Sequence, residues 1–179
     1  MLKVRYKRPR ENTVKVLLMM DSGGSMDYYS TLCSALFQAV SKSGHFKDLQ
    51  VFYFHNCVYS YLYRDPTLMT RYAVPTDWVL GNIPSDYKLI LVGDAQMAPY
   101  ELLGGSYGRM GQTGGPKSGM DWLRLLKSRY RHTVWLNPSR RPAWSNYWGE
   151  TYDLIAREFP MFPLSVEGLE EGMKKLLTR

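Results

Sequence analysis

The chain has 179 residues, 45% hydrophobic and 14% aromatic, which suffices for one domain with a full core and argues against disorder. Its formal net charge of +7 is compatible with an acidic partner, a nucleic acid or an anionic surface. With two cysteines, no apolar run of about 18 residues and no secretory signal, the sequence shows no disulfide framework or membrane span, and we expect a cytoplasmic protein.

Residues 1–12 are basic and precede the first predicted strand. We expect them to form a linker or N-terminal extension, followed by one domain over residues 13–179. A short apolar run predicts a buried strand over residues 14–20, which ends at Asp21. Because the run does not alternate with polar residues, both faces of this strand should be covered, as in a parallel α/β sheet.

Two glycines after this strand predict a tight turn into a helix over residues 27–43. The next strands are expected at residues 49–54 and 58–63. The connection between them is short, so the two strands should pair as an antiparallel hairpin. Residues 64–75 are predicted as a loop, and Thr76 is predicted to be the N-cap of a short helix.

A second apolar run predicts a strand over residues 87–94 that ends at Asp94. A long loop over residues 95–117 follows, with one helical turn near Pro99. The remaining elements are a helix capped by Ser118, a strand at 132–136, a helix at 149–158, a short strand at 161–165 and a last helix capped by Ser165.

This order of elements predicts an α/β fold of the doubly wound, Rossmann-like class. We expect a mostly parallel six-stranded sheet with one antiparallel edge strand and helices on both faces.

Two aspartates follow apolar strands that should lie parallel, so Asp21 and Asp94 should face each other at one rim of the sheet. Ser25 follows from the first turn, and Thr76 opens a helix on the other side. Carboxylate and hydroxyl oxygens suit Mg²⁺ or Mn²⁺, with water completing the coordination shell. The three histidines lack the spacing of zinc ligands.

These residues resemble a known family. Asp-x-Gly-x-Ser at residues 21–25, a threonine ahead of a short helix, and Val-Gly-Asp-Ala at residues 92–95 are similar to the metal-ion-dependent adhesion site of von Willebrand factor type A (VWA) domains. Further stretches are similar to the CoxE-like branch of that family, namely residues 93–102, Leu136-Asn-Pro138 followed by Trp144, and residues 161–169.

The resemblance implies a metal site in which Asp21, Ser25, Thr76 and Asp94 are ligands, with Thr70 as an alternative to Thr76. In the family pattern a serine stands where this chain has Gly23, so one hydroxyl ligand is missing and Mg²⁺ or Mn²⁺ should bind weakly. Replacing Gly23 by serine should then strengthen metal binding. Two further groups are implied: the backbone of Ser22, Gly23 and Gly24 around the metal, and a partner-binding rim of Met26, Met97, Tyr100 and Glu101.

In such domains an Asp or Glu of a partner protein fills an open position on the metal. The resemblance therefore implies a non-catalytic protein-interaction domain rather than an enzyme. It also implies work beside a MoxR-type AAA+ ATPase, in complex assembly or metallocofactor maturation.

Two alternatives remain open. A Mg²⁺-dependent phosphotransferase or hydrolase could use an aspartate after the first strand, but the dehalogenase-type pattern needs a second aspartate where Gly23 stands. A nucleic-acid-binding module could use a basic cluster with aromatic residues. That cluster would consist of Arg140, Arg141, Trp144 and Trp148.

Overall fold

The sheet has seven strands in the order β4-β3-β2-β1-β5-β6-β7. It is seen in a computed structural model that describes residues 13–42, 46–104, 117–143 and 147–178. The strands are β1 (Lys15–Asp21), β2 (Asp48–Phe54), β3 (Tyr61–Tyr63), β4 (Ala73–Pro75), β5 (Lys88–Val92), β6 (Thr133–Asn137) and β7 (Met161–Pro163). The predicted linker at 1–12, residues 105–116 and Trp144 lie outside the described residues.

Six α-helices are found in the described part of the chain, with two short 3₁₀ turns, η1 (Gly24–Met26) and η2 (Thr70–Tyr72). The helices are α1 (Asp27–Lys42), α2 (Thr76–Asn82), α3 (Pro99–Leu103), α4 (Gly119–Arg129), α5 (Tyr147–Glu158) and α6 (Val166–Leu177). Within these residues, no helix is long and apolar enough to cross a lipid bilayer.

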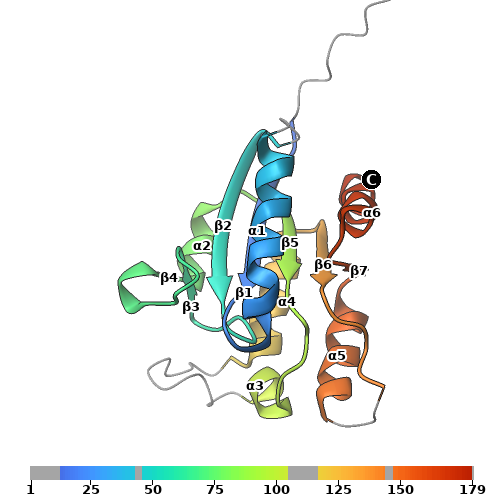
Figure 1. The fold of residues 1–179 in the computed structure, drawn as a ribbon. Helices are drawn as coiled ribbons and strands as arrows, with labels where there is room; N and C mark the ends of the chain where they lie inside the picture. Colours follow the sequence, from blue (N-terminus) through green and yellow to red (C-terminus); the bar gives the residue numbers. More distant parts are fainter. Residues whose placement is uncertain (1–12, 43–45, 105–116, 144–146, 179) are drawn as a thin grey trace, which may run out of the picture.

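Helices cover both faces of the sheet, as the unalternating apolar runs predict. Side chains of β1 divide between two cores: Leu18 packs with residues of α1 and α6, and Met19 packs with residues of α2 and α4. Figure 1 shows α1 in front of the central strands and α2 and α4 behind them. The central strands therefore bury side chains on both sides, which explains their continuous apolar sequence.

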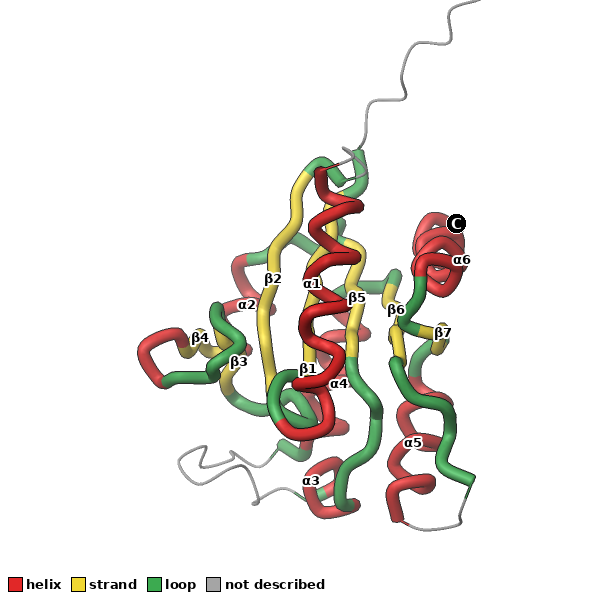
Figure 2. The backbone as a smooth tube through the Cα atoms, in the orientation of Figure 1, coloured by secondary structure: helices red, strands yellow, loops and turns green. Residues whose placement is uncertain are grey.

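The strand order reverses direction at β1. The chain passes from β1 through α1 to β2 on one side, whereas β5 pairs with the other edge of β1. Both pairings are parallel, and the arrowheads in Figure 1 show that the carboxyl ends of β1, β2 and β5 lie at the same end of the sheet. The loops that follow these strands leave from that end (Figure 2). The point between β1 and β5 is thus a topological switch point, where open α/β sheets bind ligands.

The sheet differs from the prediction at one edge. It has seven strands rather than six, and two short strands, β3 and β4, form antiparallel pairs there instead of one. The added strand is β4, which lies inside the predicted loop 64–75. It has three residues and ends at Pro75, so it offers no apolar run, and its pairing with β3 defines it.

The helix starts are partly as predicted. Ser118 and Ser165 cap α4 and α6, and each side chain accepts a backbone N–H from its helix. The prediction for α2 is wrong, because its N-cap is Pro75 and Thr76 is its first residue. The hydroxyl of Thr76 instead donates to the carbonyl of Tyr59 at 2.6 Å.

Candidate metal centre

Two carboxylates stand at the switch point. Asp21 is the last residue of β1 and Asp94 follows β5, and each is 5% exposed. Gly93 brings them together, because a Cβ atom there would lie 3.2 Å from the Asp21 Cβ and 3.5 Å from its Oδ2. The chain leaving β5 therefore passes directly against the Asp21 side chain, and a larger residue at position 93 would push it away.

Asp94 is fixed by three hydrogen bonds. The Ser25 hydroxyl donates to its Oδ2 at 2.5 Å, and the backbone N–H of Gln96 donates to its Oδ1 at 3.0 Å. The amide of Asn137, at the end of β6, donates to the Asp94 carbonyl at 2.9 Å. The structure thus brings Ser25 and Asp94 together, as their positions in the sequence predict.

The charge of Asp21 is poorly compensated. Burial raises the pKa of this carboxyl well above its usual range, and the negative charges of Asp94 and Glu101 raise it further. The backbone N–H of Asn56 opposes this by donating to Oδ1 at 2.9 Å. A buried carboxyl with further carboxylates beside it is a suitable place for a divalent cation, which would offset the repulsion.

The turn after β1 is held by His55, whose Nδ1 lies 2.8 Å from the carbonyl oxygen of Ser22. The Ser22 hydroxyl donates to the Pro66 carbonyl, so it is engaged away from Asp94. Gly23 has φ 86° and ψ 167°, a conformation that is essentially restricted to glycine. A Cβ at Gly23 would also lie 3.2 Å from His55 Nδ1, so this backbone opposes the serine of the family pattern.

The threonine ligand is less well placed. Thr76 is fully buried, and it donates two hydrogen bonds to the segment between β2 and β3, from its hydroxyl to Tyr59 and from its N–H to Ser60. The hydroxyl proton is thus occupied, but the oxygen lone pairs can still accept. Thr70 lies in η2, where its side chain is exposed.

Glu101 belongs to the site in a way that its sequence position does not reveal. Its Oε1 accepts a hydrogen bond from Asn56 Nδ2 at 2.7 Å, and its Oε2 accepts from the Ala98 N–H at 2.8 Å. Asn56 therefore contacts Asp21 through its backbone and Glu101 through its side chain. The sequence feature that could have indicated this contact is an asparagine in a tight connection. Asn56 has a φ of 60°, and asparagine tolerates this conformation better than most residues do.

The other predicted rim residues divide by exposure. Met26 and Met97 are buried, at 2% and 1% exposure, whereas Tyr100 is 58% exposed. Met26 lines a cavity beside Asp21, and Met97 packs in the core between the sheet and α4. Of these three, Tyr100 has the most exposed side chain.

The donor set suits a hard cation. Among the described residues, no three His, Cys, Asp or Glu side chains form a group that could hold a metal by themselves. A cation here would be bound by Asp21, Asp94 and the Ser25 hydroxyl, with water in the other positions. Such an all-oxygen shell with several waters is the one that Mg²⁺ prefers.

A scan of protein-family models, a search of curated proteins and a search of solved structures found no match to this chain. The structure itself shows an α/β fold with a mixed, mostly parallel sheet, and two buried aspartates lie at its switch point.

Proposed function

We propose that the chain is a non-catalytic protein-interaction domain of the VWA type, whose metal-ion-dependent adhesion site binds an acidic residue of a partner. Asp21, Asp94 and Ser25 hold Mg²⁺ or Mn²⁺, and Thr76 contributes as a further ligand, directly or through water. The observation that carries the proposal is the pair of buried carboxylates at the switch point, with Ser25 bonded to Asp94.

The proposed chemistry follows from the small number of protein ligands. A cation held by two carboxylates and a hydroxyl keeps water-filled positions, which a partner's Asp or Glu can take. That contact is charge-assisted, and the net charge of +7 would steer acidic partners towards the domain. The resemblance to the CoxE-like branch extends the proposal to a MoxR-type AAA+ ATPase as partner.

The two alternatives receive less support. The position at which a phosphotransferase would need its second carboxylate holds Gly23, which could supply no acid or base. In the basic cluster, Arg141 forms a two-pronged ion pair with Asp153, at 2.7 and 2.8 Å, which reduces its availability to a phosphate backbone.

Calorimetric titration of Mg²⁺ and of Mn²⁺ into the protein tests the proposal. We expect binding by the wild-type chain and its loss in Asp21→Ala, with Asp77→Ala as a control because Asp77 is an exposed residue of α2. Equal binding by all three proteins, or no wild-type binding at millimolar metal, would contradict a site at Asp21.

A further inference from the structure

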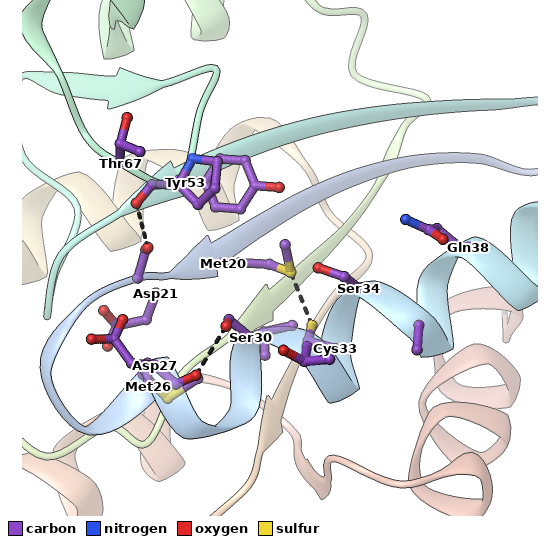
Figure 3. A pocket seen from close by; sticks show the side chains of 15 residues that line it. Met20, Asp21, Met26, Asp27, Ser30, Cys33, Ser34, Gln38, Tyr53 and Thr67 are labelled. Carbon is purple, nitrogen blue, oxygen red and sulfur yellow. Dashed lines mark hydrogen bonds between the residues drawn. The ribbon is translucent and has the colours of Figure 1, made fainter.

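A cavity of about 480 Å³ opens beside Asp21, between α1 and the carboxyl ends of β1 and β2 (Figure 3). Its floor is apolar, with Met20, Cys33 and Tyr53 among the lining residues. Hydroxyl groups of α1, including Ser30 and Ser34, lie along one side. Asp21 lines the cavity, whereas Asp94 and Ser25 are not among its described lining residues, so a group bound at the proposed cation would reach the cavity past Asp21.

A second cavity, of about 320 Å³, continues along the same groove. The two cavities share Met20, Ser34, Gln38 and Tyr53, so the space between α1 and β2 is continuous. The second cavity is also lined by Lys42, at the end of α1, and by Arg64. The guanidinium of Arg64 lies over the ring of Phe52, which packs in the core on the other face of the sheet. The groove therefore runs from the carboxylates at one end of α1 to Lys42 at the other.

The chemistry changes along the groove. The described residues lining the first cavity include Asp21 and Asp27 but no lysine or arginine, so an acidic side chain would be repelled there. An uncharged side chain such as leucine would bury its surface against the apolar floor. At the far end, Lys42 would favour a second acidic group.

The length of the groove limits the ligand. α1 has 16 residues, and at about 1.5 Å per residue it spans roughly 24 Å. An extended chain covers about 3.3 Å per residue, so roughly seven residues would reach from the cation to Lys42.

We infer that the α1–β2 groove binds an extended segment of a protein partner with an acidic residue at the cation, a large apolar side chain in the first cavity, and a second acidic residue beside Lys42. This inference rests on the proposed function, because the first acidic residue is the one that the cation holds. It adds the order of acidic and apolar side chains along the partner segment that the groove would select.

The test uses the peptide acetyl-Glu-Leu-Ser-Gly-Ser-Gly-Glu-amide with protein labelled with ¹³C at its methionine methyl groups, in Mg²⁺. We expect the signals of Met20 and Met26, which line the first cavity, to shift with peptide. The signal of Met120, which is buried in the core on the other face of the sheet, should not move. Replacing the peptide's leucine by serine should weaken binding at least about tenfold, since a leucine-sized side chain loses its burial.

Matched variants locate the peptide. Gln38→Trp should block the groove, because Gln38 lines both cavities, whereas Ala39→Trp places the same side chain on an exposed residue of α1 that lines neither. Lys42→Met should weaken binding of the peptide that carries the distal glutamate. It should not weaken binding of the same peptide with glutamine at that position. Each of the three variants must keep the wild-type melting temperature for the comparison to count.

The outcomes separate this inference from the proposed function. Peptide binding that needs Mg²⁺ and the first glutamate, but leaves Met20 and Met26 unmoved and tolerates Gln38→Trp, overturns the groove and keeps the metal site. Binding that is unchanged by a chelator overturns both. If no peptide binds while Mg²⁺ alone still titrates, the inference is overturned and the metal site stands.

Discussion

Asp21 is a buried carboxylate whose charge is opposed by burial and by two neighbouring acids, Asp94 and Glu101. Removing that charge should relieve repulsion in the metal-free protein. We therefore expect Asp21→Asn to raise the melting temperature in a chelator at pH 8, while abolishing the stabilisation that Mg²⁺ gives the wild type. The amide oxygen can still accept the Asn56 N–H, so the fold is retained.

Thermal melts with and without Mg²⁺ check this. A ligand that binds only the folded state adds about 2.7 kcal/mol at 100 times its dissociation constant. Glu170→Gln, an exposed change on α6, should alter neither melt. If Asp21→Asn were less stable than the wild type in chelator, the carboxylate would stabilise the metal-free fold, which would contradict the prediction.

Gly23 leads to a second prediction. Its positive φ and the nearby His55 ring make any side chain strained, so Gly23→Ala and Gly23→Ser should each destabilise by about 1–3 kcal/mol. We expect no gain in metal affinity from the serine, contrary to the expectation from the family pattern. Gly81 is the matched control: it lies in α2 with no atom within 4 Å of its Cβ position, so Gly81→Ala should stabilise by about 0.4–1 kcal/mol.

Urea denaturation gives the four free energies of unfolding, and Mg²⁺ titration gives the affinities. A serine variant that bound Mg²⁺ more tightly than both the alanine variant and the wild type would show that the hydroxyl reaches the cation despite the strain.

The sequence predicted the placement of Asp21, Asp94 and Ser25 because each directly follows an apolar strand or its turn, and the ends of adjacent parallel strands must meet. It did not predict the contacts of Asn56. Those depend on how α3 approaches the connection after β2, which is set by tertiary packing and leaves no periodic signal.

At the level of elements, α6 packs closely on the end of β7. A Cβ at Gly168 would lie 1.9 Å from the Pro163 carbonyl oxygen, whereas one at Gly172 meets side chains at 3.5 Å or more. Gly168→Ala should therefore displace α6 and destabilise by about 1–3 kcal/mol or more. Gly172→Ala should stay within about 1 kcal/mol of the wild type, because a small contact change is set against better helix propensity.

Chemical denaturation of the two variants compares the same substitution on the same helix. Equal free energies of unfolding would mean that α6 does not approach Pro163 as closely as the structure shows.

Helices α4 and α5 are joined by an ion pair between Arg124 and Glu158 at 2.6 Å, with Lys127 at 3.4 Å. The Arg124 hydrogen bond holds the pKa of Glu158 below its usual value. A lowered pKa stabilises the folded state above the unfolded-state pKa of about 4.3, and this contribution is lost as pH falls through the folded-state pKa. Because Arg124 is 59% exposed, solvent screening limits the effect of Glu158→Gln to about 0.2–1 kcal/mol at pH 7.

Free energies of unfolding measured from pH 7 to pH 3 should show the wild type and Glu158→Gln converging at the acidic end. Convergence should also occur at high salt. A difference that persisted at pH 3 would assign the effect to packing of the side chain rather than to its charge.

The element order was largely predictable, because the strands with continuous apolar runs and the capped helices have strong local signals. At the edge of the sheet, β3 and its antiparallel pairing with β2 were predicted, but β4 was not. Each has three residues, and β3 pairs with β2 through a single residue pair, Tyr53 with Tyr63. Such strands are defined by their neighbours rather than by their own sequence.

For the whole molecule, this uneven pairing should produce a gradient of stability. β1 is paired along its length with β2 and, on its other edge, with β5, and it is buried on both faces. Its amides should exchange hydrogen only through global unfolding. Amides of β3 and β4 should exchange through local opening at a lower free energy.

Native-state hydrogen exchange with and without Mg²⁺ then tests how the proposed site is coupled to the fold. Metal binding should raise the exchange free energy of β1 and β5 amides, because global unfolding releases the cation. β4 leads directly into Thr76, so if Thr76 is a ligand, opening of β3 and β4 also releases the cation and their amides gain the same protection. We expect that shared gain. Protection that rises in β1 and β5 but not at Leu62 or Val74 would remove Thr76 from the ligand set while leaving Asp21 and Asp94 in it.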